Sequence, residues 1–247
     1  MRRELRILLI TSLLGAIWAW GGELLVAGSK MEIFKIDEGD IDIHGLRYLT
    51  RETVLQAMDL TPETSVWRDT DLWAEDLGAL PLVRSANVVR RLPHTIIVSL
   101  LERQPVALVP TPTMEPVDGD GIRLPLDPAS HRLDLPILET EYPFMEGGRI
   151  MPPRTRLLAS EVNRLMQADT AFLQMLSEMR WGKDNSLVAR WSKPDVDFLL
   201  PLGLSAERLR EGLIALTHAI NQTPRDLPKS IDLRFANLVV VRRVNEN

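Results

Sequence analysis

The 247-residue chain contains no cysteine. This absence excludes structural disulfides, thiolate zinc sites, iron–sulfur clusters and cysteine nucleophiles. The chain also lacks a large excess of charge of one sign, because 29 Lys and Arg residues against 34 Asp and Glu residues give a formal net charge of −5. A chain with this balance has no overall attraction for nucleic acid or for an anionic membrane surface. The composition therefore argues against a general polyanion binder.

Motifs of the common enzyme classes are also missing. The sequence has no Gly-x-Ser-x-Gly elbow, no phosphate-binding glycine loop and no His-Glu-x-x-His helix. Its histidines are scattered, without a second ligand at metal-binding spacing; they are His44, His94, His131 and His218. We therefore predict no catalytic residue, no cofactor, no metal site and no small-molecule substrate.

One acidic turn is the strongest candidate for a metal site. Asp118 and Asp120, in the string Val-Asp-Gly-Asp-Gly, resemble a fragment of a calcium loop. A complete loop needs further oxygen ligands at regular spacing, and residues 122–126 supply none. Asp-Gly between two apolar runs is the usual composition of a β-hairpin turn, so a turn is favoured over a metal site.

The amino-terminal residues determine the predicted topology. Three arginines in residues 1–6 precede residues 7–27, a stretch in which Glu23 is the only ionisable residue. As a helix this stretch would be about 31 Å long, enough to cross a hydrocarbon core of about 30 Å. The positive-inside rule then keeps residues 1–6 in the cytoplasm and places the remainder outside. The alternative is a cleavable signal peptide, because Val26-Ala27-Gly28 has small residues at a suitable cleavage position.

The region after the anchor has the pattern of a compact α+β module. Residues 36–43 alternate as a half-buried strand, and Thr50 is placed to cap a helix over residues 51–58. A second helix follows the cap candidates at 69–71, and two β-rich runs at 85–92 and 95–101 form a predicted hairpin. The order strand, helix, helix, strand, strand places both helices on one face of a small sheet.

A β-rich second domain with flanking helices is predicted from residue 104. Its expected strands are residues 106–109, 114–117, 122–126, 135–138, 187–191, 196–202 and a long final strand at 231–243. Helices are expected over residues 154–167 and 170–179, and after the cap residue Ser205. The fold class is therefore α+β.

Two surface features of the first module have competing interpretations. Arg90 and Arg91, beside Arg84 and Arg103, could form a basic patch, but nearby acidic residues favour an ordinary solvated face. Trp67 and Trp73 lie at near-helical spacing, which is more typical of core residues than of a binding platform.

Six short strings, in the same order, resemble the FtsQ/DivIB family of bacterial cell-division proteins. They are residues 41–45, 80–88, 91–96, 102–107, 116–121 and 231–235. The resemblance implies a non-enzymatic scaffold of the divisome that links early and late proteins at the division septum. It further implies a cytoplasmic tail at 1–6, a single inner-membrane helix at 7–27, a periplasmic POTRA domain at 33–103 and a β domain at 104–243.

The resemblance also implies two partner-binding regions. Recruitment through the POTRA hairpin would fall on Val88 and Arg90. The last strand would bind FtsB, itself bound to FtsL, through Arg234, Phe235, Asn237, Leu238, Val239, Val240 and Val241. Other septal proteins such as FtsK, FtsW and FtsI are further implied partners.

The residues of the last strand agree with this expectation but leave one alternative open. Residues 238–241 are apolar on both faces. In an edge strand they would invite another chain, whereas in a central strand helices of the same domain would cover them.

Two other functions are weighed against the scaffold. A POTRA-bearing chaperone of outer-membrane assembly would usually show tandem repeats or a barrel pattern, and neither is visible. An anchored exported hydrolase would have to use Asp118, Asp120 and Glu102 as its acids.

Overall fold

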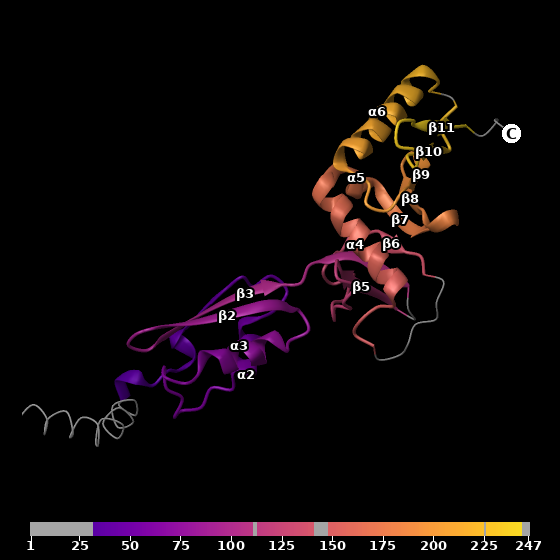
Figure 1. The fold of residues 1–247 in the computed structure, drawn as a ribbon. Coiled ribbons are helices and arrows are strands. Elements are labelled where there is room, and N and C mark those ends of the chain that lie inside the picture. The colour runs from indigo at the N-terminus through magenta and orange to yellow at the C-terminus, as the bar shows by residue number, and fades with distance from the viewer. Residues whose placement is uncertain (1–31, 111–112, 141–147, 225, 244–247) are drawn as a thin grey trace, which may run out of the picture. The chain divides into compact units, whose positions relative to one another are not determined.

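The computed structural model describes residues 32–110, 113–140, 148–224 and 226–243 (Figure 1). The chain divides into two compact units between Glu102 and Arg103. The predicted membrane helix at 7–27 and the tail at 1–6 lie outside the described residues. Across the four described ranges, no helix has the length and apolar character needed to cross a membrane.

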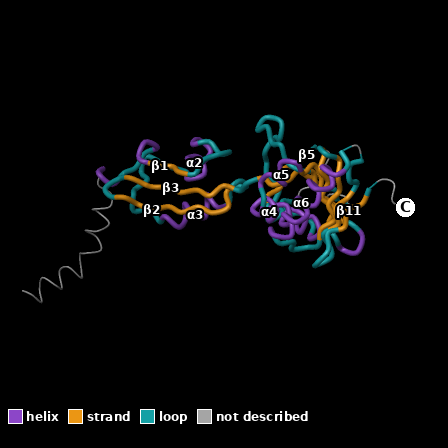
Figure 2. The backbone as a smooth tube through the Cα atoms, turned by 90° about the horizontal axis from the view of Figure 1, so that it is seen from above, coloured by secondary structure: helices purple, strands orange, loops and turns teal. Residues whose placement is uncertain are grey.

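The first unit is a three-stranded sheet with two helices. In chain order its elements are β1 (Ile41–His44), α2 (Arg51–Met58), α3 (Thr70–Gly78), β2 (Val83–Arg91) and β3 (Thr95–Glu102). Short 3-10 turns at Glu32–Phe34 (η1) and Glu38–Asp40 (η2) come before β1. The strand order is β1-β3-β2, with β1 parallel and β2 antiparallel to β3, so β2 forms one edge (Figure 2).

Helix-capping residues and the alternation of buried and exposed side chains along the strands explain these elements. Thr50 accepts a hydrogen bond from the Thr53 backbone N–H at 3.3 Å, as the sequence predicts for the start of α2. Alternate residues of β3 are buried against the helices, whose buried side chains are Val54, Met58, Trp73 and Leu77. The Trp73 indole N–H donates to the Met58 carbonyl at 2.9 Å, which ties α3 to the end of α2.

The second unit is built on a mixed sheet of eight strands. Its strands are β4 (Pro105–Pro110), β5 (Met114–Asp118), β6 (Ile137–Leu138), β7 (Leu176–Trp181), β8 (Leu187–Ser192), β9 (Asp195–Leu200), β10 (Ser230–Asp232) and β11 (Val240–Arg242). They run in the order β11-β10-β9-β8-β7-β6-β4-β5. The helices α4 (Pro153–Ala168), α5 (Thr170–Met175) and α6 (Ala206–Gln222) lie on one side of this sheet (Figure 1).

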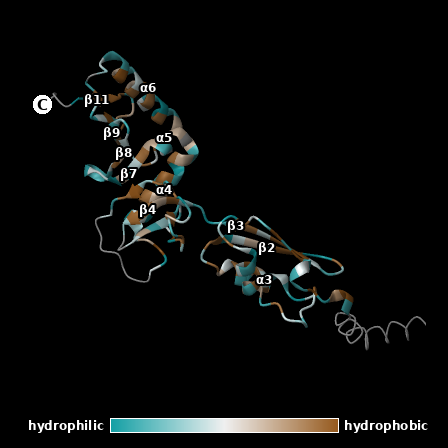
Figure 3. Cartoon of the chain, turned by 180° about the vertical axis from the view of Figure 1, so that it is seen from behind, coloured by the Kyte–Doolittle hydropathy of each residue, from teal (hydrophilic) through white to brown (hydrophobic). Residues whose placement is uncertain are grey.

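The core of the second unit lies between the sheet and its helices. Phe172, Trp191 and Phe198 form an aromatic cluster with ring centroids 5.0 to 5.4 Å apart. The helix α6 is amphipathic, with hydrophobic and hydrophilic residues on different sides (Figure 3). At Gly212 it packs closely against Leu233, the residue after β10: a Cβ at Gly212 would lie 2.6 Å from Leu233 Cδ1, so a larger residue there would displace the Leu233 side chain.

Three local predictions in the two units are wrong. The first strand begins at Ile41 rather than residue 36, because the Asp37 carboxylate caps the η2 turn through the Gly39 N–H at 2.7 Å. The helix predicted over 170–179 ends at Met175, and Leu176 begins β7, which pairs with both β6 and β8. The strand predicted at 122–126 is reduced to isolated bridges at Ile122 and Arg123.

The long final strand predicted at 231–243 is also wrong. The chain forms a hairpin instead, in which β10 and β11 pair antiparallel, with Ile231 opposite Val241. Residues 233–239 connect the two strands, so Arg234, Phe235, Asn237, Leu238 and Val239 lie in this loop rather than in a strand. A turn at Asp232 breaks the strand, because its carboxylate accepts from the Arg234 backbone N–H at 3.1 Å.

Candidate functional site

The β10–β11 hairpin forms one end of the eight-stranded sheet. Among the described strands β11 has β10 as its one neighbour, so its other edge is open. The structure therefore places β11 at an edge and not at the centre of the sheet. An open edge presents unpaired backbone N–H and C=O groups, to which another chain can add a strand.

The loop between the two strands is held from the helix side. The Arg208 guanidinium, on α6, donates through Nη2 to the carbonyl oxygens of Phe235 and Leu238, each at 2.6 Å. Arg208 also pairs with Glu211 one turn later in the same helix. These bonds fix the loop that carries most of the predicted binding residues.

A buried ion pair holds the loop from the sheet side. Asp232 is fully buried, and its carboxylate accepts from Arg234 Nε at 2.8 Å and from Arg234 Nη2 at 2.6 Å. The Arg242 guanidinium, on β11, lies 3.8 Å from the same carboxylate. Hydrogen bonding by Arg234 holds the pKa of Asp232 below its ordinary value, and Asp232 raises the pKa of Arg234.

These contacts separate the predicted binding residues into two groups. Phe235 and Leu238 are 50% and 58% exposed, so the loop before β11 presents two large apolar groups to solvent. Val239 and Val241 instead pack against the core of the unit. Arg234 forms the ion pair with Asp232, and Asn237 is exposed in the loop.

In the first unit the two residues predicted for partner binding at the POTRA hairpin differ in exposure. Val88 is 8% exposed and belongs to the core beneath the helices, so its side chain has no free surface for a partner. Arg90 is exposed, and its guanidinium donates to the Arg68 carbonyl at 3.0 Å. Its neighbour Val89 is the exposed apolar residue of this strand.

The acids considered for a hydrolase all have structural partners. The Glu102 carboxylate accepts from the backbone N–H groups of residues 47–49, at 2.7 to 3.1 Å. Asp118 accepts from the N–H groups of Asp120 and Ile122 and from Arg103 Nη1 at 2.7 Å. No group of three His, Cys, Asp or Glu side chains within the described part of the chain could hold a metal ion.

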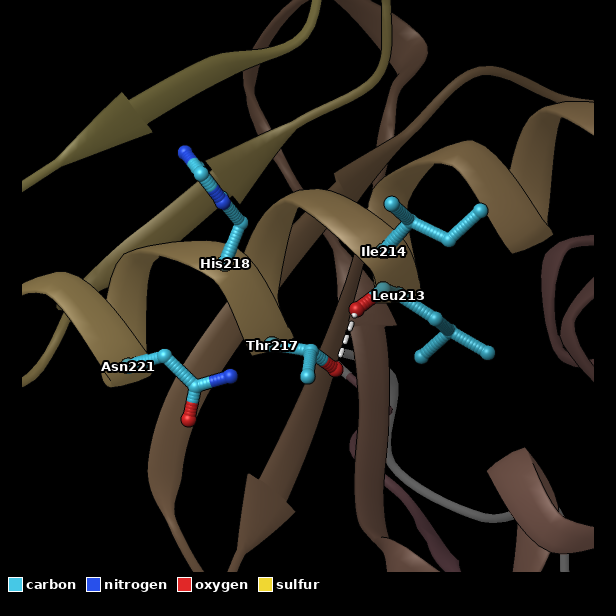
Figure 4. A pocket seen from close by; sticks show the side chains of 5 residues that line it. All are labelled: Leu213, Ile214, Thr217, His218 and Asn221. Carbon is cyan, nitrogen blue, oxygen red and sulfur yellow. Dashed lines mark hydrogen bonds between the residues drawn. The ribbon is translucent and has the colours of Figure 1, made fainter.

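A shallow hollow on the outer face of α6 also offers no catalytic arrangement. Its volume is about 390 Å³, and it is lined by Leu213, Ile214, Thr217, His218 and Asn221 (Figure 4). His218 Nε2 is 2.8 Å from the Gln222 amide nitrogen, and no carboxylate lines the hollow. A histidine without a nucleophile or an orienting acid beside it does not form a catalytic pair.

Comparison with known proteins supports the FtsQ resemblance. Residues 39–103 match the family described as "POTRA domain, FtsQ-type". The protein named Cell division protein FtsQ from Mycolicibacterium smegmatis is 30% identical over 161 residues, which cover 59% of this chain and 47% of that protein. The chain therefore carries an FtsQ-type POTRA domain and is similar to FtsQ cell-division proteins. Cell division protein FtsQ from Syntrophotalea carbinolica is 27% identical over 124 residues, covering 50% of this chain and 42% of that protein.

These matches confirm the resemblance found in the sequence. The FtsQ-type POTRA match spans three of its six strings, at residues 41–45, 80–88 and 91–96. The part of each curated FtsQ relative that the chain matches is less than half of that relative's length. The mixed α+β architecture, with a POTRA domain followed by a sheet-rich region, agrees with the predicted fold class.

Proposed function

We propose that this protein is a non-enzymatic scaffold of bacterial cell division. Residues 7–27 anchor it in the inner membrane, and its POTRA and β domains lie in the periplasm at the division septum. The arginines of residues 1–6 and the apolar stretch at 7–27 support this orientation. The similarity to FtsQ proteins supports the role in division.

The scaffold binds its main partner at the open edge of β11. One observation carries this proposal: the strand β11 has an unpaired edge, and the loop that leads into it carries the exposed side chains of Phe235 and Leu238. A partner strand would pair with the backbone of β11, and its side chains would cover the two exposed apolar groups. The periplasmic segment of FtsB, bound to FtsL, is the proposed occupant.

The direction of one backbone group indicates which residue of β11 would face a partner strand. The Lys229 N–H donates to the Arg242 carbonyl at 2.8 Å, so the backbone of Arg242 faces the β10 side. Backbone groups alternate in direction along a strand, and the N–H and C=O of Val241 therefore face the open edge. A partner strand would bond to Val241 and leave the bonds of Arg242 in place.

The proposed site is tested by calorimetric titration of residues 32–247 with the periplasmic segment of FtsB from the same organism. We expect saturable one-to-one binding that Phe235→Ala and Leu238→Ala each weaken about tenfold, as expected for loss of a well-buried apolar contact. Leu202→Ala is the matched control, because Leu202 is a similarly exposed leucine of the same unit, outside the hairpin. Equal affinities for all four proteins would place the binding site elsewhere.

Recruitment through the POTRA domain is proposed for Arg90 and its exposed neighbour Val89 rather than for Val88. The burial of Val88 means that a change there acts on the POTRA core. Val89→Ser should therefore reduce septal recruitment of a fluorescent fusion without lowering the melting temperature, whereas Val88→Ser should lower both. Normal recruitment of a stably folded Val89→Ser, Arg90→Ser double variant would contradict this part of the proposal.

A further inference from the structure

Three exposed apolar side chains gather at one end of the POTRA unit. Ile33 lies in η1, Trp67 in the loop before α3, and Leu92 at the turn of the β2–β3 hairpin; all three are large and at least 45% exposed. We call this surface, formed by residues 32–35, 65–68 and 90–94, the entry end. It is the end at which the chain arrives from residue 31.

Several contacts hold the three segments of the entry end together. The rings of Phe34 and Trp67 meet edge to face, with centroids 5.6 Å apart, and the Val66 N–H donates to the Phe34 carbonyl at 2.8 Å. The Arg90 guanidinium lies 6.0 Å over the Trp67 ring and donates to the Arg68 carbonyl. The three segments that carry the exposed side chains are therefore joined to one another.

The exposure of Trp67 is the observation that the POTRA fold does not explain. The sequence predicts both Trp67 and Trp73 as core residues, and the structure buries Trp73 completely. Trp67 keeps 45% of its surface in solvent, although it is fixed by Phe34 on one side and Arg90 on the other. A tryptophan held in place and half exposed is typical of a binding surface.

The short chain between the proposed membrane helix and the entry end limits how far this surface can lie from the bilayer. In the proposed topology the membrane helix ends at residue 27, and the entry end begins at Glu32. Five residues can extend at most about 18 Å, at about 3.3–3.6 Å per residue. The entry end is thus confined to the neighbourhood of the lipid headgroups, where tryptophan is enriched.

We propose that the entry end rests on the membrane surface, with Ile33, Trp67 and Leu92 in contact with the lipid interface. This inference rests on the membrane anchor of the proposed function. Lys35, Arg68, Arg90 and Arg91 can keep their charged ends in the headgroup layer while their stems lie along the apolar surface. The contact sets the POTRA hairpin turn against the bilayer and holds the opposite end of the sheet away from it.

Net charge does not drive this contact. The four basic residues of the region are offset by acidic residues in the same segments and in the adjoining turns, namely Glu32, Asp37, Glu38, Asp40, Glu63 and Asp69. We therefore expect the contact on a zwitterionic bilayer, with little dependence on salt. Three side chains bind weakly as a free module, but the anchor makes the contact intramolecular and raises the effective concentration of lipid.

The absence of cysteine makes a direct test possible, because a single introduced cysteine can carry a fluorescent probe. Leu92→Cys places the probe at the entry end, and Leu101→Cys is the matched control. The two leucines are 53% and 54% exposed; Leu92 lies in the turn before β3 and Leu101 near the far end of that strand, about 20 Å along it at about 3.4 Å per residue. The full chain is placed in phosphatidylcholine nanodiscs with and without lipids that carry a nitroxide quencher near the headgroup.

Our inference predicts at least twofold quenching of the probe at position 92 and almost none at position 101. In the Leu92→Cys protein, adding Ile33→Ser and Trp67→Ser should reduce the quenching by half or more. Equal quenching at positions 92 and 101, or no effect of the added substitutions, would overturn the inference.

A third protein, Leu14→Cys, separates this inference from the anchor on which it depends. Strong quenching at position 14 by a nitroxide deep in the acyl chains, combined with no quenching at position 92, would retain the anchor and refute the membrane contact. No quenching at position 14 would refute the anchor, and the membrane contact with it.

Discussion

The ion pair between Asp232 and Arg234 should hold the β10–β11 hairpin in its folded conformation. Asp232→Asn keeps the shape of the side chain but turns one acceptor oxygen into a donor that faces the guanidinium of Arg234. Arg234 is partly exposed and can turn to water, so the cost is smaller than for a fully buried pair, at about 2 kcal/mol. That free energy corresponds to roughly 30-fold faster amide exchange in the hairpin.

Hydrogen exchange followed by mass spectrometry measures this effect on peptides that cover residues 226–243 and, for the control, residues 187–200. Asp195→Asn is the matched control, because Asp195 forms a bidentate pair with Arg190 but is exposed to solvent. An exposed pair contributes about 0–1 kcal/mol, so this variant should change exchange at its own site less than sixfold. If the two variants accelerate exchange equally, burial of the Asp232 pair does not stabilise the hairpin.

Other predictions follow from the same contacts. Arg208→Ala removes two hydrogen bonds to the carbonyls of Phe235 and Leu238. The amides of residues 233–239 should therefore exchange at least tenfold faster, and affinity for the FtsB segment should fall. The control variant Arg210→Ala should leave both the exchange rates and the affinity unchanged. Glu102→Gln weakens three backbone bonds and should lower POTRA stability by about 1–3 kcal/mol, measured as faster exchange in residues 47–58 with the β domain unchanged. The lowered pKa of Asp232 means that its contribution to stability is complete above the ordinary pKa of about 3.9 and is lost as the pH falls through the lower folded value. Hairpin exchange, corrected for intrinsic rates, should therefore accelerate below about pH 4 in the native protein and less so in Asp232→Asn; identical pH profiles would contradict this assignment.

Elements with local signals could be predicted from the sequence. Thr50, Asp69 and Ser205 cap the three helices whose starts they predict, because each side-chain oxygen accepts a backbone N–H of the first turn. The β2–β3 hairpin follows from two β-rich runs around Pro93. In these cases the residues that specify the element lie within it.

The errors occurred where distant residues decide the structure. Leu173, Leu176 and Met179 have helical spacing, but residues 176–181 form β7 because β6 and β8 provide strand partners on both sides. The final apolar run has the pattern of one strand, although Arg208 on α6 holds its middle as a loop. Tertiary contacts of this kind leave no periodic signal in the strand sequence itself.

The candidate site could be predicted only in part. The sequence located the region that carries the open edge, and Phe235 and Leu238 are exposed there. It gave no sign that Val88 is buried or that Arg234 is paired with Asp232, because both facts depend on packing and hydrogen bonds. The exposure of Trp67 also depends on packing. Its near-helical spacing to Trp73 does not indicate which face of the POTRA unit each ring occupies.

The most direct test of strand addition at β11 is amide exchange by NMR on residues 32–247, with and without a saturating FtsB segment. The account predicts that the Val241 N–H, which faces the open edge, exchanges at least tenfold more slowly in the complex. The POTRA amides of β3, such as that of Val98, should be unchanged. Tight binding of the segment with unchanged exchange at Val241 would contradict strand pairing at this edge.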